Sequence, residues 1–293
     1  MINAKFNIRL FLFVAVLFSL AGSQGYSQGT DIRSVKQKHF YIGFSANSGQ
    51  SSLTVTDNSS ISSLVSKKGS SFGGSFEIGY SFNRIIGLST GAGYSMYSTG
   101  LSLATYTNAY DTTDSEGEKY NRRIDGQNIA ETQKISFVNI PLALNLQIPF
   151  SNSFGLYIQS GINFSIPMQK SFNNTGTFSY SGYYPAYNVT IENISYEGFL
   201  SNYKNSVDGN ITLKSMYEEL FASAGFQLTI HNSVQISLGG FYNKILSDMS
   251  DNSSTFNSFH LSSGPGKMES LIQGTSKPAL SSMGLKITIR FYL

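Results

Sequence analysis

The sequence contains no cysteine and no tryptophan, and only 13% of its 293 residues are charged. Without cysteine, the chain has no disulfide scaffold, no thiolate metal site, no cysteine nucleophile and no lipid-modified cysteine. Soluble domains devote about a quarter of their residues to Asp, Glu, Lys and Arg, so the charge here is sparse for a surface that faces water. The formal net charge is only +3, and no stretch is rich in Lys and Arg. This distribution argues against nucleic acid as a partner.

An apolar run from Leu10 to Leu20 follows Lys5 and Arg9 and leads into small residues. This order is typical of a secretory signal peptide. The run is too short to cross a bilayer as a helix, which takes about 20 residues. We therefore predict a signal peptide over residues 1–27, cleaved after position 23 or 27, and a periplasmic N-terminal segment over residues 28–37.

Alternating apolar side chains are the main pattern in the rest of the chain. From Val138 to Phe150, every second residue is apolar and the residues between them are polar, small or proline. A period of two indicates a strand, and this one is longer than the five or six residues usual in soluble sheets. The same alternation predicts eight strands, near residues 40–46, 72–82, 86–96, 136–150, 156–166, 220–230, 234–242 and 283–293.

The connections between these strands alternate in length. Short turns are expected near residues 83–84, 151–153 and 231–233, and long polar connections over 47–71, 99–133, 171–214 and 247–278. Long loops count against a compact soluble domain, whereas short periplasmic turns and long external loops are usual in outer-membrane barrels. We predict an all-β fold over residues 38–293: an eight-stranded, antiparallel, up-and-down transmembrane β-barrel with short periplasmic turns and long extracellular loops.

A soluble lipocalin-like barrel with its apolar face inside is the alternative. Two observations favour the membrane barrel. The small and polar face fits the narrow interior of eight strands, and charges on the apolar face occur only near the expected outer strand ends, as at Lys134, Lys170, Glu218 and Lys244. A charge at the centre of a bilayer costs about 2–4 kcal/mol.

The segment from Phe137 to Leu144 resembles the aromatic-x-x-Ile-Pro-Leu segment of PorT-like outer-membrane β-barrel proteins, with Ile140, Pro141 and Leu142 as its core. The resemblance extends over residues 38–293. It implies a small barrel in the outer membrane of a Gram-negative bacterium, in a family with some members tied to protein secretion, and it implies no catalytic residues. Such barrels often end in an outward aromatic residue that the insertion machinery reads. Here the last residue is Leu293, and Phe291 precedes it by two positions.

An interior polar cluster is expected from Glu77, Lys286 and Arg290. All three fall on the small and polar face, and closure of the barrel places only Gly43 and Ser45 of the first strand between them. Long cationic side chains can then reach the carboxylate in a charge-assisted network. The cluster either fills the interior and sets the register of the strands, or gates a narrow channel.

Two further groups are candidates for binding at the outer side. Lys134, Lys170 and Lys244 are expected at the outer rim, either as a lipopolysaccharide-binding ring or as solvated loop stems. The third long connection combines tyrosines with Ser, Gly and Asn, a composition suited to recognition of a protein or glycan and equally to strands that extend beyond the membrane. Its tyrosines are Tyr180, Tyr183, Tyr184, Tyr187, Tyr196 and Tyr203.

Catalysis has little support in the sequence. The chain has only His39, His231 and His260, and His260 alone has serines nearby in a loop. A lipid hydrolase is therefore a remote alternative, and no metal or cofactor motif is present. We predict a non-enzymatic outer-membrane protein with a structural or recognition role, in contact with outer-membrane lipid, lipopolysaccharide and the barrel-insertion machinery and associated with a secretion or surface assembly. The alternative is a narrow passive channel.

Overall fold

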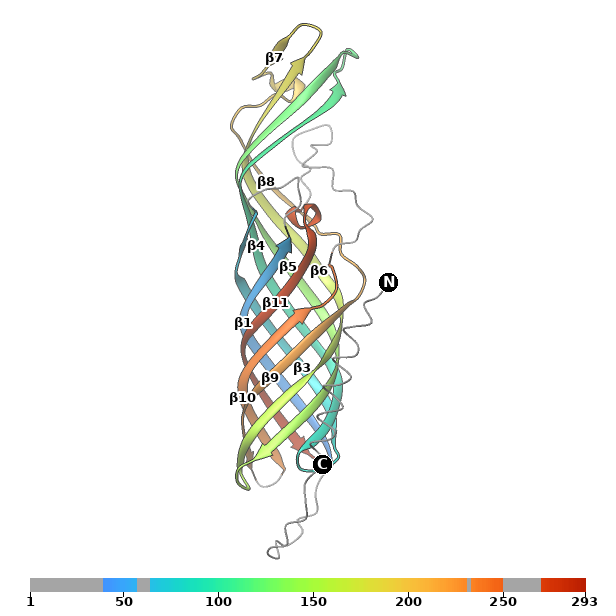
Figure 1. The fold of residues 1–293 in the computed structure, drawn as a ribbon, viewed down its shortest axis with the longest axis vertical. Coiled ribbons are helices and arrows are strands. Elements are labelled where there is room, and N and C mark those ends of the chain that lie inside the picture. The colour runs from blue at the N-terminus through green and yellow to red at the C-terminus, as the bar shows by residue number, and fades with distance from the viewer. Residues whose placement is uncertain (1–38, 57–63, 231–232, 250–269) are drawn as a thin grey trace, which may run out of the picture. The chain divides into compact units, whose positions relative to one another are not determined.

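The computed structural model describes residues 39–56, 64–230, 233–249 and 270–293 (Figure 1). The predicted signal peptide, the periplasmic segment, His231 and His260 lie outside the described residues. Within the described residues, no helix has the length and hydropathy needed to cross a membrane.

The described residues form antiparallel strands and two short 3-10 helices, η1 (Ser195–Glu197) and η2 (Leu271–Gly274). The strands are β1 (Phe40–Thr56), β2 (Leu64–Lys67), β3 (Gly69–Ser81), β4 (Ile86–Thr113), β5 (Lys119–Pro149), β6 (Phe154–Tyr184), β7 (Val189–Ile191), β8 (Tyr203–Asn210), β9 (Tyr217–Ile230), β10 (Val234–Ile245) and β11 (Ser276–Tyr292).

The strands are hydrogen-bonded to one another in a closed ring. The order β4-β3-β1-β11-β10-β9-β6-β5 runs through eight long strands, and β5 pairs with β4 again. The first and last strands meet along most of their length, from Tyr41 opposite Tyr292 to Thr54 opposite Ala279. The sheet is therefore closed, and it has an inner and an outer face. Each predicted strand matches part of one of these eight and runs past its end by at most one residue.

The long connections are shorter than the sequence predicted. Residues 99–113 and 119–133, expected as a loop, are the far ends of β4 and β5, and β6 continues to Tyr184. These ends pair up to Thr113 opposite Lys119 and Asn121 opposite Tyr183. Leu103 of β4 lies opposite Ile129 of β5. We call the ends of β4, β5 and β6 that lie beyond this level, away from the short turns, together with β7 and β8, the distal sheet (Figure 1). The prediction of a loop was wrong because the alternation continues here with aromatic and polar residues that resemble loop composition.

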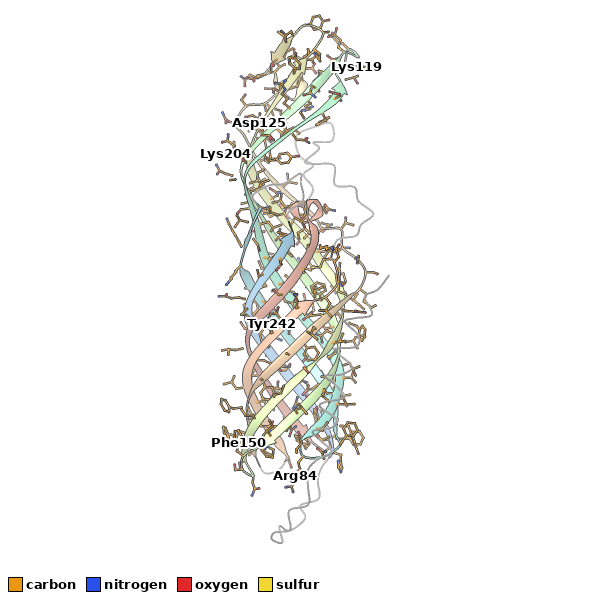
Figure 2. All side chains as sticks on the ribbon, viewed as in Figure 1. Arg84, Lys119, Asp125, Phe150, Lys204 and Tyr242 are labelled. Carbon is orange, nitrogen blue, oxygen red and sulfur yellow. The ribbon has the colours of Figure 1, made fainter. Side chains whose placement is uncertain are left out.

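The outer face near the short turns is apolar. Phe72, Leu142, Phe226, Leu238 and Leu285 each expose half or more of their surface. We call this region the apolar belt; it extends from the short turns to the level of the exposed side chains Lys134 and Lys244. Figure 2 shows Phe150 and Arg84 at the short-turn end and Tyr242 midway along the sheet, with Lys119, Asp125 and Lys204 on the distal sheet.

Aromatic side chains gather at the short-turn end of the belt. Tyr80 contacts Phe40 and Phe82, with ring centroids 4.8 and 5.4 Å apart, and Phe154 stacks on Phe226 at 5.6 Å. All five rings are at least 37% exposed. Rings at such positions form the interfacial girdles of outer-membrane barrels.

The inner face changes character along the sheet. Within the belt it carries small and polar residues, including Gly43, Ser89, Asn145 and Gln235. Towards the distal sheet it becomes an apolar core, to which Leu101, Ile135, Phe137 and Tyr217 belong, all at most 1% exposed. The 3-10 helix η2 inserts Leu271 and Ile272 into this core, and both are fully buried. The core therefore closes the interior at the end opposite the short turns.

Candidate functional site

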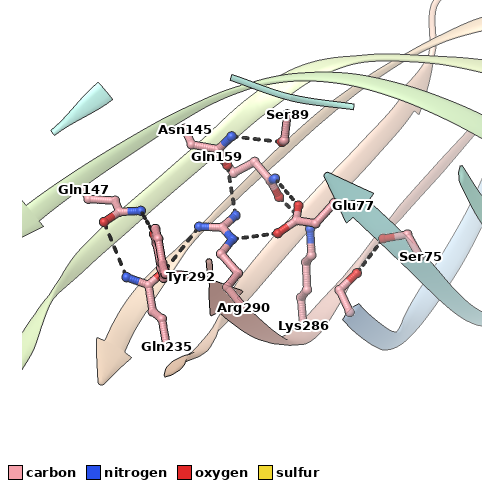
Figure 3. Close-up of polar contacts among 11 residues, drawn as sticks. Ser75, Glu77, Ser89, Asn145, Gln147, Gln159, Gln235, Lys286, Arg290 and Tyr292 are labelled. Atoms are coloured by element: carbon pink, nitrogen blue, oxygen red, sulfur yellow. Dashed lines mark hydrogen bonds and ion pairs between the residues drawn. The ribbon is translucent and has the colours of Figure 1, made fainter. Parts of the chain in front are cut away.

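The interior polar cluster lies within the apolar belt, on the inner face of the sheet (Figure 3). The Arg290 Nε donates to Glu77 Oε1 over 2.6 Å, and both side chains are at least 93% buried. Glu77 and Arg290 lie opposite Gly43 of β1, one from each side. A Cβ at Gly43 would lie 2.8 Å from Glu77 Cγ, so glycine leaves the space through which the two side chains meet.

Arg290 also binds across the interior to strands on the opposite wall. Its Nη2 donates to Asn145 Oδ1 over 2.9 Å, and Asn145 Nδ2 in turn donates to Ser89 Oγ over 2.9 Å. The guanidinium lies 5.0 Å from the centre of the Tyr41 ring. A fully buried arginine thus has an ion pair, amide partners and an aromatic face, and its contacts join β11 to β3, β5, β10 and β1.

Lys286 is in the same cluster but does not touch the carboxylate directly. Its Nζ donates to Gln159 Oε1 over 2.7 Å, and Gln159 Nε2 donates to Glu77 Oε2 over 3.1 Å. The structure therefore brings Glu77 and Arg290 into contact and links Lys286 to them through Gln159 of β6. The alternating pattern placed all four side chains on the inner face.

A cavity of about 70 Å³ adjoins this cluster, with Glu77, Gln159 and Lys286 in its wall. Most of its remaining wall is Ser, Asn and small residues. Phe221 and Phe241 form part of its boundary towards the apolar core. The cavity has room for several water molecules.

Two further buried acids were not predicted as interior sites. Glu219, 1% exposed, accepts from Tyr97, Asn163 and Ser165 over 3.3–3.5 Å. Glu219 shares the inward parity of Ser223 and Gln227 on β9, so the period of two signals its position. Glu131 lies in the region expected as a loop, and nothing in the local sequence indicates its burial.

Glu131 binds the segment that precedes β11 in the chain, through Ser270 and Leu271. Its Oε1 accepts from Ser270 Oγ over 2.6 Å and from Gln133 Nε2 over 2.7 Å. Its Oε2 accepts from the Leu271 N–H over 2.7 Å and from Asn174 Nδ2 over 3.1 Å. Burial raises the pKa of this carboxyl, and the four donors oppose the rise. Glu131 therefore links β5 and β6 to the segment that plugs the apolar core.

The three rim lysines do not share one face. Lys134 and Lys244 are exposed on the outer face. Lys170 is half-buried and lies opposite Ile135, whose side chain is in the apolar core. The outward placement of Lys170 was wrong because β6 has a bulge: Ser136 pairs with Gln169 and Phe137 with Pro167, so Met168 is extra. One extra residue reverses the faces beyond it.

The six tyrosines of the third connection divide into buried and exposed groups. Tyr180 and Tyr184 are buried, at 3% and 6% exposure, and Tyr183 is half-buried with the Arg123 guanidinium 4.7 Å from its ring centre. Tyr187 and Tyr196 are 63% and 85% exposed, and Tyr203 is 37% exposed. Three of the six thus pack within the distal sheet, and Tyr187 and Tyr196 are the most available for a partner.

Aromatic packing holds the distal sheet together. Tyr120 stacks on Tyr184 at 5.1 Å and meets Phe199 edge-on at 5.6 Å. The Arg122 guanidinium lies 5.7 Å from the Tyr180 ring centre and donates to the Gly198 carbonyl over 3.0 Å. Burial and a hydrogen bond to Asp114 raise the pKa of Tyr184 to about 12. The distal sheet is therefore held together by its own packed aromatic side chains.

Catalytic groups do not assemble in the described part of the chain. His39 Nδ1 donates to the Ser81 carbonyl over 2.8 Å, which is a structural contact. Within the described residues, no group of three or more His, Asp or Glu is placed to hold a metal ion. His260 lies outside them.

Comparison with known proteins gives no family and no curated relative. No family model matches the chain, and no curated protein matches it, so the resemblance to PorT-like barrels stays a prediction. Among solved structures, the chain is similar to Neisserial surface protein A (10% identity, 87% of this chain and 97% of that chain covered, TM-score 0.34). It is also similar to the outer membrane protein OprG of Pseudomonas aeruginosa (13%, 90% and 100%, TM-score 0.33) and to the attachment invasion locus protein Ail of Yersinia pestis (12%, 86% and 99%, TM-score 0.29).

Proposed function

We propose that the chain is an eight-stranded transmembrane β-barrel of a Gram-negative outer membrane, that it is not an enzyme, and that it acts through the distal sheet on the cell exterior. The observation that carries the proposal is the apolar belt around a closed sheet whose interior within the belt is polar. A soluble closed sheet places its apolar residues inside and its polar residues outside. Here that order is reversed, as hydrocarbon around the sheet requires.

The orientation follows from the two ends of the sheet. Outer-membrane barrels have short turns on the periplasmic side and long connections outside. The turns after β3, β5 and β9 are short, whereas β4 and β5 have 28 and 31 residues. A strand needs only about 9–11 residues to cross a membrane. The distal sheet therefore extends well beyond the bilayer on the proposed outer side.

The belt is tested by arginine substitutions on one strand and one face. Leu142→Arg places a cation in the belt at a position 57% exposed, and we expect it to lower the free energy of unfolding in vesicles by about 2–4 kcal/mol. Thr132→Arg is the matched control, since Thr132 is exposed on β5 beyond Lys134, and its effect should stay near zero. Urea titration in lipid vesicles measures both. Equal effects of the two substitutions would refute a transmembrane belt.

A closed interior favours a structural or recognition role over a passive channel. Arg290, paired with Glu77, reaches Asn145 on the opposite wall within the belt, and η2 with the apolar core closes the end next to the distal sheet. We infer that the wild-type protein conducts no steady ionic current. Planar-bilayer recordings test this, and steady single-channel currents that change in Arg290→Ala would instead support the channel.

Recognition of a protein or glycan is the role proposed for the distal sheet. Tyr187 and Tyr196 are highly exposed beside a packed framework, and rigid aromatic side chains on a fixed scaffold bind at low cost in conformational entropy. We expect Tyr187→Ser with Tyr196→Ser to abolish capture of surface partners from intact outer membrane while the barrel stays folded. Tyr203→Ser, at a less exposed position, is the control. Unchanged capture by the double variant would remove these tyrosines from the proposal.

Outer-membrane lipid and the insertion machinery are the remaining proposed partners. Lys134 and Lys244 lie on the outer face where the belt ends, at the level expected for lipopolysaccharide phosphates. At the short-turn end of the sheet, where β11 ends, Phe291 is 40% exposed and Leu293 is 69% exposed. We propose that the exposed Phe291 supplies the aromatic signal for insertion.

A further inference from the structure

Two exposed lysines flank β4 at the end of the apolar belt that is away from the short turns. Lys67 belongs to β2 and lies opposite Gly100 of β4, and Lys134 belongs to β5 and lies opposite Ser98 of β4. Both lysines are exposed. The sequence did not single out Lys67, because it lies in the connection 47–71 that was expected as a loop.

Both lysines are on the outer face of the sheet. Residues that lie opposite each other in neighbouring strands point to the same side. Leu101 is fully buried, so Gly100 before it points outward, and its partner Lys67 points the same way. On β5, Lys134 is exposed beside the buried Ile135. The two ammonium groups therefore start from one surface.

Only small residues of β4 separate the two lysines. Neighbouring strands lie about 4.8 Å apart and a strand rises about 3.4 Å per residue. The two lysines are two strands and two residues apart, which places their Cα atoms about 12 Å from each other. A Cβ at Gly100 would lie 3.2 Å from Lys67 Cβ and 3.9 Å from Lys67 Cδ, so the lysine stem lies against β4. Two ammonium groups on such long, flexible stems can reach one anion above Ser98 and Gly100.

The charge of this pair is not balanced by a neighbouring acid. Within the described residues, neither Lys67 nor Lys134 has a carboxylate at ion-pair distance. Glu131 is close in sequence, but its side chain is buried on the inner face. Lys244 differs, since it pairs with the residue two positions from Glu218, which is exposed. The pair of Lys67 and Lys134 is therefore a cationic site, and Lys244 has an acid nearby.

The surface beside the pair changes from apolar to polar. On the side of the short turns, Tyr94 and Met96 are exposed on the outer face of β4. At the level of the lysines, the outer face carries the hydroxyls of Ser98 and Thr132. A ligand at this place meets two cations and hydroxyl groups at one end and an apolar surface at the other. These are the requirements of a lipid with an anionic headgroup.

We propose that Lys67 and Lys134 together bind one phosphate group of a phosphorylated lipid in the outer leaflet, with its acyl chains against Tyr94 and Met96. The proposal rests on the transmembrane barrel proposed above, because hydrocarbon around the belt places the pair at the membrane surface. Each lysine near an anionic membrane surface strengthens binding by about fivefold. Lys244 is outside this site, although it lies at the same level.

Native mass spectrometry of the full chain in detergent micelles tests the site, with bisphosphorylated lipid A as the probe. We expect one lipid A molecule to stay bound to the wild-type chain. Lys67→Gln combined with Lys134→Gln should weaken this binding by about 25-fold. Lys244→Gln is the matched control and should leave it unchanged. Equal binding by the wild type and the double variant would overturn the proposal.

Two further probes identify the part of the ligand that is bound. Lipid A without its phosphates should bind the wild type and the double variant equally, because the lysines then have no anion to contact. Inorganic phosphate at the same concentration should not displace bisphosphorylated lipid A, because it lacks the acyl chains. A preference of the wild type for the dephosphorylated lipid, or displacement by inorganic phosphate, would overturn the proposal.

Insertion into phosphatidylcholine vesicles separates this site from the barrel itself. The wild type and the double variant should insert equally, as measured by protection of the strands from trypsin. If both insert and bind lipid A equally, the lysine pair is not a lipid site and the transmembrane barrel stands. If the wild type does not insert, the barrel and the lipid site are both refuted.

Discussion

The two halves of the closed sheet are built in opposite ways. Within the apolar belt, apolar side chains such as Leu142 and Leu285 point outward while Glu77 and Arg290 are buried. Towards the distal sheet, Leu101 and Ile124 are buried while Thr132 and Asp125 are exposed. The same strands β4, β5 and β6 pass through both halves. One backbone therefore carries two opposite amphipathic patterns, which fit the proposed surroundings of lipid for one half and water for the other.

The reversal has a consequence for stability. Where hydrocarbon surrounds the sheet, burial of apolar side chains inside gains nothing over the lipid, and polar contacts organise the interior. Where water surrounds it, the hydrophobic effect operates as in a soluble core. We expect substitutions at inner positions to act through different forces in the two halves.

The largest effect is expected from removing the carboxylate of the polar half. Glu77→Ala leaves two buried cations without their counter-ion and should lower the free energy of unfolding by about 3–5 kcal/mol. Glu77→Ala combined with Arg290→Met removes both members of the ion pair and should recover part of the loss. Urea unfolding in vesicles measures both variants, and an unchanged midpoint for Glu77→Ala would contradict the contact.

A similar but somewhat smaller effect is expected from a cavity in the apolar half. Leu101 is fully buried, and Leu101→Ala should cost about 3 kcal/mol. Leu285→Ala, on the outer face of the apolar belt at 67% exposure, is the matched control and should cost much less. Equal losses at the two leucines would mean that the halves do not differ.

The pH dependence of Glu131 gives a smaller and more specific signal. Its folded pKa is raised above the ordinary value, so the folded state holds its proton to higher pH than the unfolded state. Stability from this group is therefore present at pH values below the ordinary carboxyl pKa and is lost as the pH rises through the folded pKa. Glu131→Gln has no such titration. The difference in unfolding free energy between wild type and Glu131→Gln should fall with rising pH across that window, and a flat difference would contradict it.

The smallest effects are expected in the distal sheet and its connections. Tyr196→Ser changes a side chain that is 85% exposed and should alter stability by less than about 0.5 kcal/mol. Tyr184→Ser removes a stacked ring and a hydrogen bond to Asp114 and should speed hydrogen exchange of the β5–β6 amides near Tyr120. Slow exchange at these amides in Tyr184→Ser would show that the aromatic packing is dispensable.

Particular residues show how far the alternation could be followed. The period of two placed Glu77, Lys286 and Arg290 on one face because a strand turns successive side chains to opposite sides. It missed Lys170 because the bulge at Met168 leaves no mark in the sequence. It missed Glu131 because the partners of this carboxylate, Ser270 and Leu271, are about 140 positions away.

The sequence by itself determined the pattern of eight alternating segments, the short and long connections, and a small, polar face that fits the narrow interior of eight strands. These features are local, since each strand shows its two faces in its own residues. Only the tertiary structure decided that β4, β5 and β6 continue as the distal sheet, that an apolar core closes the interior, and that Tyr180 and Tyr184 are buried. Those outcomes depend on register and on contacts between distant segments, which the period of a single strand does not contain.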